Sequence, residues 1–199
     1  MAGQIFAYIT HKEGKADDTA LELAKAAGKV FPDAPVTAIV TGAGADLDAV
    51  CNEVAAIYKE VWKFDNPALT YPNAEAVRKL LVNALPQDAV VFCGHDTFGM
   101  DLAPGLAIKM DSVFLPDVVD FDGLDGDTIK VIRQEYSGQI STHVNGDISA
   151  GAVINIRPGA FQPDEAGSAG GQVVDKSSEA GDLTVGRQFL EVVAAEVGD

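Results

Sequence analysis

The sequence is poor in cysteine. Only Cys51 and Cys93 are present among 199 residues, and neither belongs to a Cys-x-x-Cys motif or to a cysteine–histidine spacing suited to zinc. We therefore expect two buried thiols in a reducing cytoplasm, and neither a disulfide framework nor a metal site.

Positive charge is also scarce. Fourteen Lys and Arg residues stand against 30 Asp and Glu, which gives a formal net charge of −16. Nucleic acid or an anionic membrane would repel such a chain, so neither is an expected partner. No apolar run approaches the ~18 residues that a membrane helix requires, and the start MAGQIFAYITHKEGK shows no secretory signal. We expect no membrane insertion.

Patterns that would indicate catalysis are few. The three histidines lie on separate predicted turns or strands, and no G-x-S-x-G motif occurs. His95 followed by Asp96 could form an acid–base pair, and a small hydrolase that uses both residues remains one alternative function. Adjacency in sequence does not provide the geometry that general-base catalysis needs. We therefore predict no catalytic residue.

The first half of the chain alternates between strand-like and helix-like segments. Apolar spacing and capping residues predict four strand–helix units, in which the strands cover 4–10, 35–42, 60–65 and 88–94 and the helices follow at 19–31, 45–58, 73–85 and 101–110. Asp46, Asn73 and Asp101 are the expected residues at three helix starts. Serial units of this kind predict an α/β fold with a mainly parallel sheet and helices on both faces.

The pattern changes after Met110. Four strand-like segments at 118–124, 127–137, 139–144 and 151–161 are joined by short Gly/Asp turns, which favours an antiparallel β appendage to the core. Residues 162–182 are rich in Gly, Ser and acid, so we predict a flexible loop there. The domain would then cover 1–161, with 183–199 as a separate C-terminal segment.

Two glycine-rich turns raise the question of nucleotide binding. Residues 94–99 have the G-x-x-x-x-G spacing of a P-loop, but Met100 and Asp101 stand where Lys and Ser/Thr are required. Residues 42–47 have Leu47 in place of the third glycine of a dinucleotide loop. We interpret both as turns that lead into helices, and an adenine-nucleotide-binding module that uses them remains a second alternative.

An acidic run at 118–127, VVDFDGLDGD, suggests calcium at first sight. An EF-hand loop that begins at Asp120 would need an oxygen ligand at its fifth position and glycine at its sixth, where Leu124 and Asp125 stand. Hairpin turns explain the two Asp-Gly pairs better, so we predict no calcium site.

Three segments in order resemble the electron transfer flavoprotein α-subunit family. They are VFCGHDTFGMDLAPGLAIKMD (91–111), VIRQEYSGQISTHV (131–144) and NIRPGAF (155–161), and together with the order of elements they extend the resemblance over nearly the whole chain. Met100 departs from the family pattern, in which many members carry a basic residue at this position.

The resemblance implies a fold, a cofactor and partners. It implies a three-layer α/β/α Rossmann-like domain of the adenine nucleotide alpha hydrolase-like type, which packs on a β subunit. It further implies electron transfer through FAD that is held mainly by a C-terminal domain absent from this chain, with a dehydrogenase or quinone reductase as redox partner. No FAD ligand of the family can be placed on these residues, so we expect an electron carrier subunit with no active site of its own.

Residues for partner contact can be proposed from the second half. Its strands carry more apolar side chains than they are expected to bury themselves; these are Phe114, Val118, Val131, Ile132, Ile140 and Val144. Arg133, Tyr136, Arg157 and Phe161 belong to residue types enriched at interfaces, and we predict that they contact the partner subunit. The alternative is that these four residues close the domain's own edge.

Overall fold

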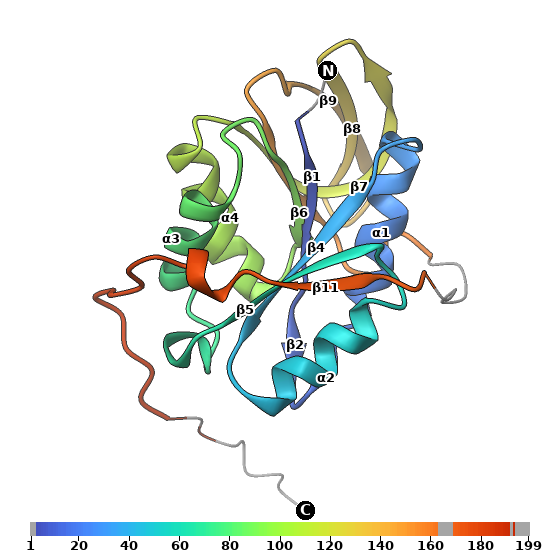
Figure 1. Cartoon of the computed structure of the whole chain (residues 1–199). Helices are drawn as coiled ribbons and strands as arrows, with labels where there is room; N and C mark the ends of the chain where they lie inside the picture. The colour runs from blue at the N-terminus through green and yellow to red at the C-terminus, as the bar shows by residue number, and fades with distance from the viewer. Residues whose placement is uncertain (1–2, 163–168, 192, 194–199) are drawn as a thin grey trace, which may run out of the picture.

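The computed structural model describes residues 3–162, 169–191 and 193 (Figure 1). Its centre is a nine-stranded sheet in the order β11-β5-β4-β1-β6-β10-β7-β8-β9. Parallel pairing joins the strands from β11 to β7, which are β11 (Gln172–Asp175), β5 (Glu60–Asp65), β4 (Val36–Gly42), β1 (Ile5–Tyr8), β6 (Val90–Gly94), β10 (Ala152–Ile156) and β7 (Val113–Asp125). A small separate hairpin, β2 (His11–Lys12) with β3 (Lys15–Ala16), follows β1.

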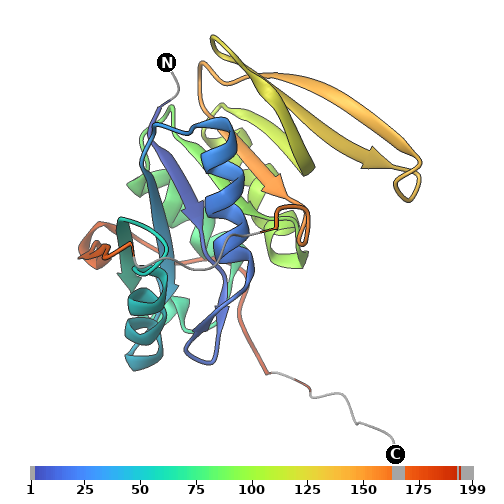
Figure 2. The ribbon, with the colours of Figure 1, turned by 90° about the vertical axis from the view of Figure 1, so that its right-hand side faces the viewer.

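Helices cover both faces of this sheet. Helices α1 (Thr19–Val30) and α2 (Ala45–Val54) pack on one face, and α3 (Ala74–Ala84) and α4 (Thr97–Lys109) pack on the other (Figures 1 and 2). Strand β1 shows why, because Ile5 and Ala7 belong to the core beneath α1 and α2 while Phe6 and Tyr8 belong to the core beneath α3 and α4. The predicted three-layer α/β/α class is confirmed.

Of the three helix starts predicted from a capping residue, only that of α3 is confirmed. The side chain of Asn73 accepts hydrogen bonds from the backbone N–H groups of Glu75 and Ala76 and so caps α3 as expected. Short 3₁₀ turns lie at Pro67–Leu69 and Ser177–Glu179. None of the described helices combines the length and apolar character that a membrane span requires.

An antiparallel extension continues the sheet beyond β7. Strand β7 pairs with β8 (Thr128–Glu135), and β8 pairs with β9 (Ile140–Asp147). We call residues 118–147 the arm, because Figure 2 shows them extending away from the helix-covered body. The antiparallel prediction for 118–144 is confirmed.

The prediction for residues 151–161 is wrong. They do not join the antiparallel extension, because β10 lies inside the sheet and runs parallel to both β6 and β7. All five of its residues are buried, since helices or the arm cover both faces. The run AVINI, apolar except for Asn155, is the sequence signal of such a strand.

The loop predicted for residues 162–182 is wrong for its second part. Strand β11 pairs in parallel with β5, and Lys63 of β5 forms ion pairs with Asp48 and Asp175. Residues 163–168 lie outside the described residues, so no part of the prediction is tested there.

The described part of the C-terminal segment packs against α3 and α4. The side chain of Leu183 is buried in the core, the ring of Phe189 stacks on Tyr71 at 3.7 Å, and Arg187 pairs with Asp101 of α4. Residues 192 and 194–199 of the predicted segment lie outside the described residues.

Candidate functional site

A cluster of charged and polar side chains lies where β6 and β10 end and the arm begins. It consists of His95 after β6, Arg157 after β10, Asp117 within β7, and Arg133 and Gln134 on β8. Ligands of open α/β sheets bind outside the carboxyl ends of parallel strands, so this is the edge where a site is expected.

Arg157 and Asp117 form the centre of the cluster. The Arg157 Nε donates to one carboxylate oxygen of Asp117 at 2.8 Å, and Nη2 donates to the other at 2.6 Å. This two-point hydrogen bond is the main cause of the lowered pKa of Asp117, with burial opposing it and His95 and Arg133 adding smaller favourable charges. The same bond raises the pKa of Arg157.

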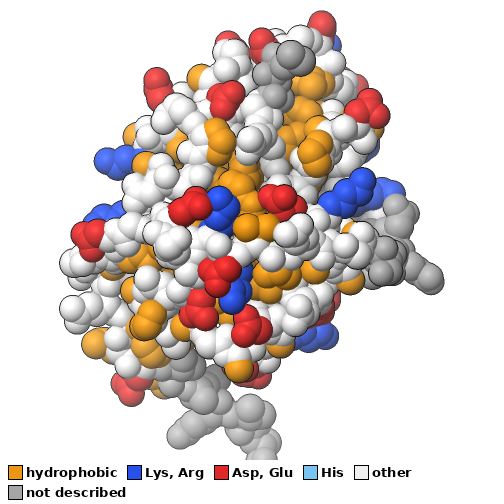
Figure 3. All heavy atoms as spheres, in the orientation of Figure 1, with side chains coloured by type: hydrophobic (Ala, Val, Ile, Leu, Met, Phe, Trp, Pro, Cys, Tyr) orange, Lys and Arg blue, Asp and Glu red, His pale blue; other side chains and the backbone are white. Residues whose placement is uncertain are grey.

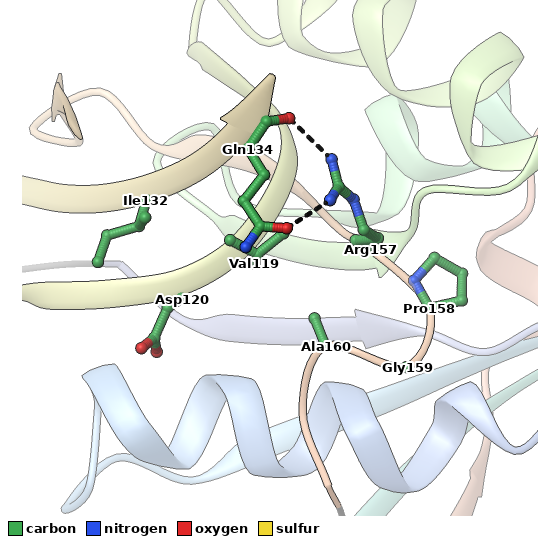
Figure 4. Close-up of a pocket in the computed structure, with 8 residues that line it drawn as sticks. All are labelled: Val119, Asp120, Ile132, Gln134, Arg157, Pro158, Gly159 and Ala160. Atoms are coloured by element: carbon green, nitrogen blue, oxygen red, sulfur yellow. Dashed lines mark hydrogen bonds between the residues drawn. The ribbon is translucent and has the colours of Figure 1, made fainter. Parts of the chain in front are cut away.

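The Arg157 guanidinium also reaches the arm. Its Nη1 donates to the side-chain oxygen of Gln134 at 3.1 Å, and Nη2 donates to the backbone carbonyl of Gln134 at 3.0 Å (Figure 4). One side chain therefore joins the end of β10 to both β7 and β8. We call Arg157, Asp117 and Gln134 the clamp.

The clamp holds a backbone irregularity in place. Asp117 has φ of +57°, a left-handed conformation that non-glycine residues rarely adopt, and the pairing of β7 with β10 shifts register beside it. The strand changes there from parallel pairing with β10 to antiparallel pairing with β8. The clamp thus fixes the point at which the arm leaves the body.

A shallow cleft of about 420 Å³ lies next to the clamp (Figure 4). Asp120 at one side points toward α1, where it pairs with Lys29, while Pro158 and Ala160 close the other side. The cleft is lined by Val119, Asp120, Ile132, Gln134, Arg157, Pro158, Gly159 and Ala160. Since Arg157 and Asp120 already have ionic partners, the cleft offers no unpaired charge to a small ligand.

The turn at 94–99 is built for its own helix. The Asp96 side chain accepts a hydrogen bond from the N–H of Gly99 at 2.7 Å and thereby caps α4, which begins at Thr97. The prediction that Asp101 starts this helix is wrong, because Asp101 lies in its second turn and pairs with Arg78 and Arg187.

The geometry of the turn at 94–99 also disfavours phosphate binding. The Asp96 carboxylate occupies the N-terminus of α4, where an anion would otherwise bind, and a Cβ on Gly99 would lie 1.9 Å from the carbonyl oxygen of Gly94. Gly99 is therefore needed for close backbone packing and not for a phosphate cradle. This geometry disfavours the adenine-nucleotide alternative.

The turn at 42–47 is similar in kind. Gly44, with φ of +77°, precedes α2, and its N–H donates to Asp65 at 3.3 Å. Asp46 lies in the first turn of α2 without a capping hydrogen bond, so the expectation that it caps the helix is wrong. Its charge still favours the helix N-terminus, and it would repel an anion there.

The His95–Asp96 pair of the hydrolase alternative is not assembled. Asp96 is engaged as a helix cap, while the Nε2 of His95 lies 3.9 Å from a carboxylate oxygen of Asp117. The Nδ1 of His95 and the Nε of Arg133 are both buried without a hydrogen-bond partner among the described residues. No described nucleophile stands beside the His95 ring in these contacts.

The four predicted interface residues lie in different environments. Arg157 belongs to the clamp and Arg133 lies beside it, whereas Tyr136 is 73% exposed at the turn between β8 and β9. Phe161 is buried and packs on Phe121 with ring centroids 5.7 Å apart. Phe161 thus closes the domain's own core, and the apolar Val118 and Val131 are buried there as well.

Two polar pairs inside the sheet had no recognisable sequence signal. Tyr8 bonds to Thr41 at 2.8 Å, and the Cys93 thiol bonds to the Asn155 side chain at 2.8 Å. Burial raises the pKa of both Tyr8 and Cys93, so both stay protonated. Tyr8 and Cys93 are therefore poor acids, while the buried Nδ2 of Asn155 has no hydrogen-bond partner among the described residues.

The two cysteines are free and buried as predicted. Burial raises the pKa of Cys51 to about 12, which makes its thiol a weak nucleophile. Within the described ranges, no group of His, Cys, Asp and Glu could hold a metal ion.

The sequence of the chain is similar to that of known proteins of one family. Residues 5–182 match the electron transfer flavoprotein domain. The chain is 26% identical over 198 residues to the electron transfer flavoprotein subunit alpha of Megasphaera elsdenii, covering 95% of this chain and 57% of that relative. It is 27% identical over 158 residues to the probable electron transfer flavoprotein subunit alpha, mitochondrial, of Cryptococcus neoformans var. grubii, covering 77% of this chain and 44% of that relative. The chain thus spans about half the length of these relatives.

Proposed function

Because the chain belongs to the electron transfer flavoprotein domain family, we propose that it is the N-terminal domain of an α subunit and serves electron transfer within a heterodimer. One observation supports this proposal most directly. Similarity to the α subunit of Megasphaera elsdenii runs through 95% of the chain but accounts for 57% of that relative. The remainder of such a subunit would form a second domain.

The described residues do not fit FAD. A flavin pyrophosphate needs cations or free N–H donors at a helix N-terminus, whereas Asp96 occupies that position in α4 and Asp46 lies in the first turn of α2. In this proposal the complete heterodimer binds FAD mainly outside this chain. The cofactor carries the redox chemistry, and this domain contributes support and partner surfaces.

The β subunit is the proposed direct partner. Tyr136, Arg133 and Arg157 provide an aromatic ring and two cations of the kind enriched at interfaces, and all three lie on or beside the arm. A dehydrogenase or a quinone reductase would exchange electrons with the assembled flavoprotein. The two free, buried thiols support a reducing compartment such as the cytoplasm.

Coexpression with the cognate β subunit tests the proposal. We expect a one-to-one complex in size-exclusion chromatography with light scattering, and we expect Tyr136→Ala to weaken it about tenfold because interface tyrosines often contribute strongly to binding. Tyr71→Ala is the matched control, since Tyr71 is also exposed but stacks on Phe189 away from the arm. A wild-type chain that stays monomeric beside the β subunit at micromolar concentration contradicts the proposal.

A further inference from the structure

Strand β9 forms a free edge of the sheet. It is the outermost strand beyond β8, and the described part of the chain places no strand on its other side. Its eight residues pair with β8 without a register shift, whereas the β7–β8 pairing has two shifts. Every second residue of β9 therefore directs its N–H and C=O groups outward along a regular strand.

This edge lacks the features by which proteins usually prevent pairing. Residues Ile140–Gly146 include no Lys, Arg or Pro, and no bulge interrupts the strand. The opposite edge differs, because β11 has only four residues and carries Asp175 next to Lys176. Acidic and basic side chains gather over β5 and β11 in Figure 3. The β11 edge is therefore protected against pairing with a further strand, whereas the β9 edge is not.

The arm holds this edge in a defined position. The clamp ties β10 to β7 and β8 through hydrogen bonds of 2.6 to 3.1 Å, and β9 pairs with β8 along its whole length. A preorganised strand loses little conformational entropy when a partner binds. Apolar surface lies at one end of the edge, where Ile140 is 49% exposed beside Tyr136.

Charge indicates what kind of strand fits. The arm contains six carboxylates and two cations, so its net charge is −4 when His143 is neutral. The carboxylates are Asp120, Asp122, Asp125, Asp127, Glu135 and Asp147, and the cations are Lys130 and Arg133. A second copy would bring the same negative arm and another total charge of −16. Electrostatic complementarity therefore favours a different chain with a basic strand.

We propose that the outer edge of β9, residues Ile140–Gly146, binds one extended strand of the β subunit, and that this strand carries Lys or Arg side chains. The added strand extends the sheet by main-chain hydrogen bonds, which is the known mode of β-augmentation. This inference rests on the proposed function, because it takes the β subunit as the partner.

Hydrogen exchange in the wild-type complex provides the first test. In the free chain, we expect the β9 amides that face β8 to exchange slowly and the alternate, outward-facing amides to exchange rapidly. In the complex with the cognate β subunit, we expect the outward-facing amides to slow at least tenfold.

Three other outcomes of the exchange experiment would contradict the inference, the proposed function or both. A stable complex in which these amides exchange as in the free chain overturns this inference and leaves the proposed function intact. Absence of any complex overturns both. Protection of the same amides in the concentrated free chain would show a second copy at the edge, which also overturns the inference.

A pair of matched variants provides the second test. Ser141→Lys places a cation on the exposed edge of β9, and Gln172→Lys makes the same charge change on the exposed end of β11 at the other side of the sheet. We expect Ser141→Lys to weaken the complex at least tenfold, less so in high salt, and Gln172→Lys to change it by less than twofold. Equal effects of the two variants would overturn the inference.

Discussion

At the scale of single residues, Asp117 shows how one ion pair supports a strained backbone. Its left-handed φ is tolerated because both carboxylate oxygens accept hydrogen bonds from Arg157, which in turn holds Gln134. Both ionic side chains are mostly buried, at 33% and 22% exposure, so solvent screens the pair only in part.

Replacing Asp117 by Asn should reduce stability in a pH-dependent way. The variant loses a charged hydrogen-bond acceptor, and we expect a free energy of unfolding lower by about 2 kcal/mol at pH 7. Because the folded pKa of Asp117 is lowered, its contribution is complete above the unfolded pKa of about 3.9 and is lost as the pH falls through the folded value.

Urea unfolding at pH 7 and near pH 3 measures this difference. The gap between wild type and Asp117→Asn should narrow at the lower pH, because below a pKa of about 3.9 the unfolded chain binds a proton that the folded Asp117 resists. Asp122→Asn is a suitable control, because the Asp122 side chain is 60% exposed and its ion pair is with His143, which is also exposed. A gap of equal size at both pH values would show that the ion pair has no such role.

The sequence allowed only part of the cluster to be recognised. Residue type marks Arg157 as a candidate interface residue, but its partner Asp117 lies 40 residues earlier and has no local signal. Residue type also marks Phe161, which is a core residue, because residue type alone does not distinguish an interface aromatic from a buried one.

At the scale of secondary-structure elements, the start of α4 provides a clear test. Asp96→Ala removes the cap on Gly99 and should cost about 1 kcal/mol of unfolding free energy. Asp101→Ala removes only partly exposed ion pairs with Arg78 and Arg187 and should cost less, about 0.5 kcal/mol. Thermal unfolding by circular dichroism compares the two variants, and the reverse ranking would favour Asp101 as the residue that fixes the helix start.

The strands were predicted with uneven success for physical reasons. The four strands predicted in the first half, β1, β4, β5 and β6, belong to strand–helix units, and the change in apolar period from two to 3.6 reveals each boundary. Strand β10 follows a run of antiparallel strands, so its position in the chain suggested the wrong pairing. Strand β11 has only four residues, QVVD, within an acidic and glycine-rich stretch, which is too short for a periodic signal.

At the scale of the whole molecule, two apolar cores lie on opposite faces of one sheet and are built from the chain's own side chains. We therefore expect the isolated protein to unfold cooperatively in the absence of flavin. We expect this chain alone to bind FAD with a Kd of about 1 mM or weaker, if at all. Adding 100 µM FAD should then leave Tm unchanged, because binding that weak stabilises the folded state by less than about 0.1 kcal/mol. Circular dichroism melts with and without FAD measure this, and a rise of several degrees would place a flavin site within this chain.

The central position of β10 has a consequence for the order of folding. Strand β6 ends at Gly94 and β7 begins at Val113, but the strand that separates them is not complete until Ile156. During synthesis on the ribosome, the arm can form its local hairpins while the sheet beside β6 still lacks its neighbour. Loop-closure entropy makes such nonlocal pairing slow. We therefore expect the nascent chain to expose an incomplete apolar sheet for longer than its strand–helix units alone would require, and to be most prone to aggregation in that interval.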